Sequence, residues 1–211
     1  MIFQMMQVGP LGVNCYIVGD ETAREVVVID PGGHARQISE LLNNLRLKVS
    51  AIVLTHAHFD HVMGVEGLKR ATGAPLMVGE KERPVFEAVE EQGEMFGFAV
   101  PPLPDPERWL NEGDVVEAGK FKLQVLEVPG HSAGSIALYN AENGVVFVGD
   151  VLMRGTIGRT DFPGCSFEEL LKSIRTKLYT LPDATKVYSG HGPMTTIGDE
   201  KLLNPFTKNY V

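Results

Sequence analysis

The chain has 211 residues, 44% of them hydrophobic, a size and composition that predict a single domain over residues 1–211 with a substantial core. Its formal charge is −8, and the basic side chains are scattered, which disfavours nucleic acid and membranes as partners. No segment approaches the ~20 apolar residues that cross a bilayer, and the amino terminus lacks a signal-peptide pattern. The two cysteines, Cys15 and Cys165, are too few for a disulfide framework, so we expect a protein of the reducing cytoplasm.

Strand and helix patterns interleave in the first half of the chain. A β-branched run at 26–29 predicts a buried strand, and apolar spacing over 38–45 predicts a helix. A second strand is predicted at 51–54, followed by a helix over 62–73 that a glycine closes. The stretch 93–107 contains four prolines, which exclude a helix or a central strand, and it either covers a pocket or forms a surface connection.

The second half shows the same mixture. Alternating apolar residues over 121–128 predict a strand, and the spacing between 136 and 148 predicts an antiparallel hairpin. Ser166 and Glu169 form a capping box ahead of an apolar stripe that continues to Leu178, which predicts a helix packed on a sheet. Because strands and helices do not alternate strictly, we predict a mixed, layered α/β architecture instead of a doubly wound parallel sheet.

Five of the six histidines follow strand-like runs, and most share their turns with an aspartate or a second histidine. Glycines precede several of these residues and permit the tight reversals that bring separate loop tips together. Imidazole and carboxylate ligands suit zinc, iron or manganese, and the lack of thiolates argues against a closed structural zinc site. The candidate metal ligands are His56, His58, Asp60, His61, His131, Asp150 and His191.

The number of candidate ligands predicts two metal ions. One tetrahedral ion cannot use seven ligands, whereas two ions ~3.5 to 4 Å apart share a carboxylate and a water. Zinc is the first choice, with iron or manganese as alternatives. Any single histidine has a packed or surface role as its alternative, and Asp60 has the alternative of capping a helix, but the joint spacing favours the metal site. His34, at a helix start, lacks a partner motif and is left out.

The motif His56-x-His58-x-Asp60-His61, followed in order by three further ligands, resembles the metallo-β-lactamase-fold hydrolases over nearly the full length. Within that superfamily, the segments 129–135, 158–161 and 189–193 resemble the glyoxalase II group, particularly its short bacterial members. The resemblance implies a four-layered αββα sandwich of two mixed β-sheets with flanking helices. It also implies how the ligands divide, which the spacing leaves open: His56, His58 and His131 on one ion, Asp60, His61 and His191 on the other, and Asp150 bridging both.

The resemblance further implies a metal-dependent hydrolase that uses a hydroxide held by both ions to cleave a small-molecule thioester, S-lactoylglutathione or a related acylglutathione. Asp60 and Asp150 are the residues assigned to catalysis. Full-length members of the group carry a carboxyl-terminal helical domain that supplies much of the glutathione pocket, and only residues 192–211 follow here, which leaves glutathione recognition open. A mononuclear-iron persulfide dioxygenase, a lactone or β-lactam hydrolase and a non-catalytic metal-binding protein are the alternatives. The pattern does not indicate an oligomeric state.

Three residues near the motifs have roles that the sequence leaves less defined. Arg159 either grips an anionic substrate or pairs with Asp161, and we favour the ion pair because bonded loop arginines are common. Cys165 precedes the capped helix and is interpreted as a small turn residue, not a reactive thiol. Asp30 ends a strand near the predicted site and resembles the family's aspartate that orients a ligand or loop from behind the metals.

Overall fold

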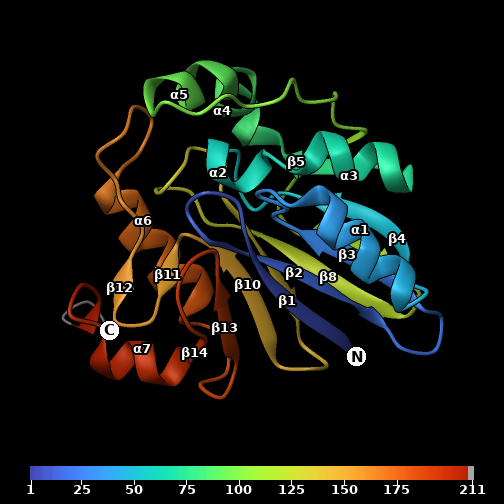
Figure 1. Ribbon diagram of the computed structural model, residues 1–211. Coiled ribbons are helices and arrows are strands. Elements are labelled where there is room, and N and C mark those ends of the chain that lie inside the picture. Colours follow the sequence, from blue (N-terminus) through green and yellow to red (C-terminus); the bar gives the residue numbers. More distant parts are fainter. Residues whose placement is uncertain (209–211) are drawn as a thin grey trace.

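Two six-stranded β-sheets pack face to face, with helices on both outer faces, in the computed structural model, which describes residues 1–208 (Figure 1). The first sheet has the strand order β1-β2-β3-β4-β5-β6. Its strands β1 to β3 pair antiparallel, and β3 to β6 pair parallel. The strands are β1 Ile2–Val8, β2 Val13–Asp20, β3 Glu25–Ile29, β4 Lys48–Val53, β5 Leu76–Gly79 and β6 Arg108–Leu110.

The second sheet is also mixed and has the order β14-β13-β10-β9-β8-β7. Strands β10 and β13 pair parallel, and the remaining neighbours pair antiparallel. Its strands are β7 Val115–Ala118, β8 Phe121–Glu127, β9 Ile136–Asn140, β10 Val145–Gly149, β13 Lys186–Ser189 and β14 Thr195–Thr196. A small hairpin of β11 Leu152–Met153 and β12 Thr156–Ile157 stands beside it.

Helices lie between strands along the chain and after the last strand. The first group comprises α1 Ala35–Asn44, α2 Phe59–Val62, α3 Val65–Thr72, the 3-10 turn η1 Glu80–Glu82, α4 Arg83–Glu87 and α5 Val89–Met95. The later group comprises α6 Phe167–Ser173, the π-helical turn η2 Ile174–Leu178 and α7 Ile197–Leu203. None of the helices within residues 1–208 combines the length and the apolar character that a bilayer crossing requires.

Three apolar clusters separate the layers. One cluster joins Val28 and Ile52 of the first sheet to Ile38 of α1, on that sheet's outer face. A second lies between the sheets, and the third joins Val146 of the second sheet to Leu170 of α6. The four layers are therefore helix, sheet, sheet and helix, and the predicted αββα sandwich with two mixed sheets is confirmed.

The strand predictions at 26–29, 121–128 and 145–148 are confirmed to within one residue, and β9 and β10 form the predicted antiparallel hairpin. The strand predicted at 51–54 is confirmed as β4, but it begins three residues earlier, at Lys48. One of the two hydrogen bonds of the predicted capping box is confirmed, because the backbone N–H of Glu169 donates to the Ser166 side chain. The end of the helix at Gly73 is also confirmed, since this residue has a φ of 66° and its N–H donates to the Lys69 carbonyl.

Two further element boundaries were wrong. The helix predicted over 62–73 is broken into α2 and α3, because Gly64 packs against the preceding loop and its N–H donates to the Pro31 carbonyl at 2.8 Å. The irregular stretch predicted from Gly93 begins later, since α5 continues to Met95. The prolines that exclude a helix start only at Pro101 and restrict only the residue directly before them, Val100, so residues up to Met95 can remain helical.

The topology explains why the predicted ligands converge. Strands β8 and β10 both pair antiparallel with β9 and so run in the same direction, and β13 runs parallel to β10. The carboxyl ends of these three strands therefore meet at one edge of the second sheet. His131, Asp150 and His191 each follow one of these strands.

Candidate metal centre

Three histidines form the first group of candidate ligands. His56 and His58 follow β4, and His131 follows β8, and one nitrogen from each lies within 4.8 Å of the others. Nε2 of His131 lies 3.2 Å from Nε2 of His56, and all three side chains are buried. The geometry matches the first of the two ligand sets that the family resemblance implies.

Asp60, His61 and His191 form the second group, and their ligand atoms also lie within 4.8 Å of one another. Asp60 and His61 are neighbours in α2, and His191 follows β13. Oδ2 of Asp60 lies 3.2 Å from Nε2 of His191 and 3.9 Å from Nε2 of His61. Helix α2 thus directs two adjacent side chains toward a loop of the other sheet.

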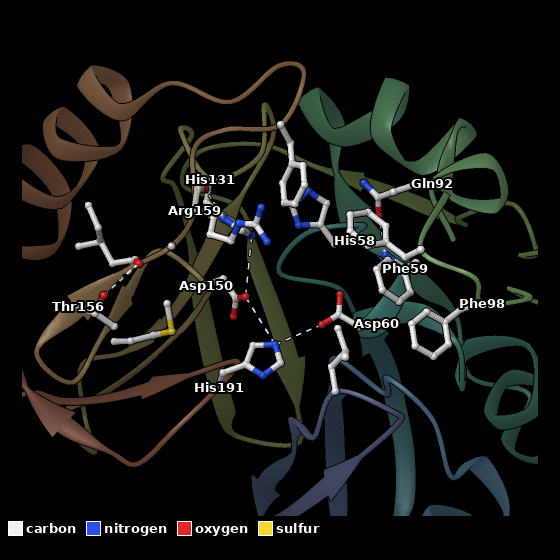
Figure 2. Close-up of a pocket in the computed structure, with 16 residues that line it drawn as sticks. His58, Phe59, Asp60, Gln92, Phe98, His131, Asp150, Thr156, Arg159 and His191 are labelled. Atoms are coloured by element: carbon white, nitrogen blue, oxygen red, sulfur yellow. Dashed lines mark hydrogen bonds and ion pairs between the residues drawn. The ribbon is translucent and has the colours of Figure 1, made fainter. Parts of the chain in front are cut away.

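Asp150 lies between the two groups. Its Oδ1 is 3.7 Å from Nε2 of His61, and its Oδ2 is 3.6 Å from Nε2 of His191 and 3.9 Å from Nε2 of His131. Figure 2 shows this carboxylate between His131 and His191, with Asp60 facing His191 from the other side. The structure therefore brings all seven predicted ligands together, with the Asp150 carboxylate between the two groups.

The outer nitrogens of the imidazoles are held by the protein. Nδ1 of His131 donates to the Arg159 carbonyl at 2.8 Å, because a carbonyl can only accept. The Thr55 hydroxyl donates to Asp30 at 2.6 Å and so accepts from Nδ1 of His56, 3.1 Å away. In the neutral imidazoles, both Nε2 atoms then carry lone pairs that face each other, which is unfavourable without a cation between them.

Two further buried atoms lack partners in the same place. Nε2 of His61 and Oδ1 of Asp150 have no hydrogen-bond partner within the described part of the chain. Buried polar atoms are usually paired, and unpaired ones call for an explanation, such as a metal ion that they would bind. Facing lone pairs, unpaired buried atoms and a nitrogen-oxygen donor set all fit divalent metal ions.

The electrostatics of the first group favour neutral imidazoles. Burial, together with the nearby His131, lowers the pKa of His58 to about 3. Burial also lowers the pKa of His131, and burial with the charge of His61 lowers that of His56 well below its ordinary value. At neutral pH these three side chains offer lone pairs without having to release protons, as metal binding requires.

The two aspartates of the site are ionised. Burial alone would raise the pKa of Asp150, but the proximity of His61 holds it well below the ordinary value. Burial alone would also raise the pKa of Asp60. The hydrogen bond of Asp60 with His191 outweighs burial, so the pKa of this carboxyl is lowered as well. That same bond with Asp60 raises the pKa of His191. The centre therefore combines carboxylates with imidazoles.

Asp30 occupies the place expected of it, behind the ligands. Its Oδ1 accepts from the Thr55 N–H at 2.7 Å, and its Oδ2 lies 3.1 Å from Nδ1 of His61. This carboxylate thus orients one imidazole directly and His56 through the Thr55 hydroxyl. His34, which is not among the predicted ligands, lies outside the three groups of candidate ligand atoms. Its Nδ1 accepts a hydrogen bond from the Gly9 N–H.

Sequence reasoning missed one buried carboxylate, Glu82. It accepts from the N–H of Ala57 at 2.9 Å, from the hydroxyl of Ser132 and from the N–H of Gly134 at 2.7 Å. These donors flank His56, His58 and His131, so a single side chain connects the two loops that carry the first group. In the sequence it stands between Lys81 and Arg83, a pattern typical of an exposed turn, and no local signal identifies it.

Two glycines allow the loops to approach this closely. Gly149 has a φ of 53°, in the left-handed region that glycine adopts without strain. A Cβ atom on Gly190 would lie 2.3 Å from Oδ1 of Asp150 and 2.6 Å from Cε1 of His61. Any side chain at position 190 would therefore intrude on the ligands.

A cavity of about 430 Å³ opens above the ligands (Figure 2). Phe96 and Phe98 of the proline-rich stretch line it and stack on Phe59, at centroid distances of 5.3 and 5.2 Å. This stretch therefore both covers a pocket and packs against the molecule. The other lining residues include Leu11, Gln92, Met153, Thr156, Ile157, Gly158 and Phe162.

Arg159 lines the same cavity but forms the ion pair that the sequence analysis favoured. Its guanidinium donates two hydrogen bonds to Asp161, at 3.0 and 2.8 Å, and lies 4.5 Å from the centre of the Phe162 ring. Cys165 is partly buried, and burial raises the pKa of its thiol, which agrees with a turn residue and not a reactive thiolate.

Comparison with known proteins agrees with this geometry. A family model described as the metallo-beta-lactamase superfamily matches residues 8–191. Hydroxyacylglutathione hydrolase GloC of Haemophilus influenzae is 39% identical over 208 residues, which cover 98% of both chains. The structure of TTHA1623 in a di-iron-bound form is 40% identical with a TM-score of 0.89, and the match covers 96% of this chain and 99% of that one.

A further solved structure, the BLEG-1 B3 metallo-beta-lactamase, is 37% identical with a TM-score of 0.91, and the match covers 97% of this chain and 99% of that one. These similarities extend over both sheets and over the edge where the predicted ligands gather. From the family model and the identity to full-length relatives, the chain belongs to the metallo-beta-lactamase superfamily.

Proposed function

We propose that the protein is a hydrolase that cleaves a thioester, S-lactoylglutathione or a related acylglutathione, at a centre of two divalent ions. The observation that carries this proposal is the convergence of seven imidazole and carboxylate side chains, with Asp150 between two groups of three. The likeness to a hydroxyacylglutathione hydrolase of nearly equal length supports the thioester as the bond that is cleaved.

In this proposal, one ion would be held by His56, His58 and His131, the second would be held by Asp60, His61 and His191, and Asp150 would contact both. Zinc is the first choice, and iron or manganese suits the same donors. When bound, two such ions lower the pKa of a water molecule near them and stabilise negative charge on a carbonyl oxygen. This chemistry needs no serine or cysteine nucleophile.

The chain's own residues prepare the site for that reaction. Asp60 and Asp150 remain ionised, so each offers carboxylate oxygens that accept hydrogen bonds and orient an attacking water. Phe59, Ile157 and Phe162 give the cavity apolar walls, and a substrate packed against them would displace water and strengthen the charge interactions inside the cavity. The cavity opens to solvent, which provides a path for the thiol product to leave.

A β-lactam is the second candidate substrate, because BLEG-1 has a closely similar fold. A β-lactam and a thioester both present a carbonyl carbon to the same nucleophile, so the site geometry does not separate them. The persulfide dioxygenase alternative requires one iron instead of two ions, which makes metal content the deciding measurement for it.

The test combines elemental analysis of protein purified without chelator with assays after loading with zinc, iron or manganese. We expect about two ions per chain and thiol release from S-lactoylglutathione that exceeds β-lactam opening. Oxygen uptake with glutathione persulfide and a single bound iron would establish the dioxygenase instead. Absence of thiol release with every metal would reject the thioesterase.

A further inference from the structure

A second open cavity, of about 540 Å³, lies beside the metal site. Its walls come from the α4–α5 segment, from the loop after His131 and from the turn 162–165, and include Val85, Ala88, Met95, Ala133 and Phe162. We propose that this cavity is a subsite for a large apolar acyl group of the substrate. The inference rests on the proposed thioester hydrolysis and extends it to a substrate class.

The cavity adjoins the cavity above the candidate metal ligands. Four residues line both spaces: His58, Gln92, Phe96 and Phe162. The ring of Phe162 contacts His58 edge-on at a centroid distance of 5.8 Å and contacts Phe96 at the same distance. A carbonyl beside the candidate ligands is therefore separated from the second cavity only by these side chains, and a chain attached to it can pass over them.

The charges around the cavity select the acyl side of a thioester over the thiol side. Thiol carriers such as glutathione bear carboxylates, which need cations. Within the described residues, neither lysine nor arginine lines this cavity, and Glu91 does. The α4–α5 segment also exposes further glutamates, which repel anions: Glu87, Glu90 and Glu94. An apolar acyl group meets no such penalty.

The exposed apolar side chains at its rim support an apolar ligand. Met95 is 79% exposed and Phe96 is 45% exposed, although both are large hydrophobic residues. Apolar side chains grouped around a cavity indicate a binding site, because a ligand removes their surface from water. The volume of about 540 Å³ also lies within the range of small-molecule sites.

The test uses S-alkylglutathiones from methyl to hexyl, thioethers that cannot be hydrolysed and that place an alkyl chain where the acyl group would lie. We expect the dissociation constant, measured by calorimetry on the zinc-loaded protein, to fall about two- to fourfold per methylene. The parallel assay measures kcat/KM for acyl thioesters of the same chain lengths. Ala88→Phe, which fills the cavity, should flatten both series.

Glu94→Phe is the matched control, because it adds the same ring to α5 at an exposed position that lines neither cavity. It should retain the steep series and the activity toward the acetyl thioester. Met95→Ser, at a largely exposed position, is a second cavity variant that keeps the test possible if Ala88→Phe fails to fold. It should reduce the dependence of affinity and kcat/KM on chain length.

The subsite would be overturned if affinity and kcat/KM did not change with chain length in the unaltered protein. It would also be overturned if the same steep dependence on chain length persisted in both cavity variants. In that case hydrolysis of the acetyl thioester would leave the proposed function standing. Failure to hydrolyse any acyl thioester would instead overturn the proposed function and, with it, the acyl group as the occupant.

Discussion

Oδ2 of Asp150 lies 3.6 Å from Nε2 of His191, and the two residues follow adjacent parallel strands, β10 and β13. The other oxygen of the same carboxylate faces His61 of the first sheet's α2. One side chain thus lies beside ligand candidates from both sheets, so in the proposed centre both metal positions would depend on it.

Asp150→Ala is expected to remove both ions and abolish turnover. The substitution deletes the carboxylate that both groups share and leaves His61 without its anionic neighbour. Elemental analysis should show less than one ion per chain, and thiol release should fall by at least about 10²-fold, since in the proposed centre this carboxylate would contact both ions. Asp161→Ala, which removes an exposed carboxylate near the same cavity, is the control and should retain both ions. Full activity with two ions in Asp150→Ala would show that this residue does not bridge.

Gly190→Ala is expected to impair metal binding although no ligand is removed. Its methyl group would lie 2.3 Å from Oδ1 of Asp150, so the carboxylate or the loop must move. We expect a loss of at least about tenfold in metal affinity, as is typical when ligand orientation is disturbed. Gly192→Ala is the matched control, because a Cβ there meets open space and only the φ of 78° is strained, at about 1 kcal/mol of stability. Equal metal affinity in the two variants would contradict the steric argument.

The seven ligand candidates could be predicted from the sequence because each lies in the segment that follows a strand, close to a glycine or to another ligand. Residue order and spacing fix which loops carry them. The contribution of Glu82 could not be predicted, since its importance arises only when two distant loops fold around it. The break at Gly64 is similar, because it depends on packing against Pro31 and not on helix propensity. The second cavity lies between three segments, so it too requires the tertiary structure.

Glu82→Gln is expected to weaken the first metal position selectively. An amide offers one oxygen where the carboxylate accepts from Ala57, Ser132 and Gly134, so one backbone N–H must face an NH2 group. Affinity at that position should fall about 10- to 100-fold, the usual cost of losing a group that orients ligands. Chelator competition measures both positions separately. Glu87→Gln, at an exposed position of α4, should change neither, and an equal loss at both positions would show general unfolding instead.

Arg159→Ala is expected to leave metal content and kcat nearly unchanged. The contact with His131 comes from the backbone carbonyl of residue 159, which the substitution retains. The lost ion pair with Asp161 is exposed, with 65% of each side chain accessible, and solvent screening leaves such pairs little effect on stability. We therefore expect a small decrease in the free energy of unfolding and a change in KM of a few-fold. A large increase in KM for anionic substrates alone would favour the alternative, in which Arg159 binds the substrate.

Removal of metal is expected to lower the thermal stability of the protein. Without a cation, the facing Nε2 atoms of His56 and His131, 3.2 Å apart, and the buried Oδ1 of Asp150 have no compensating partner. Free metal at 100 times its dissociation constant adds about 2.7 kcal/mol of stability, which corresponds to roughly 5 to 11 °C in Tm for a chain of this size. Calorimetry with and without added zinc measures the difference. The Asp150→Ala variant should show little response to zinc, because its ligand sets are incomplete, and an equal response in both proteins would place the stabilising ion outside these seven residues.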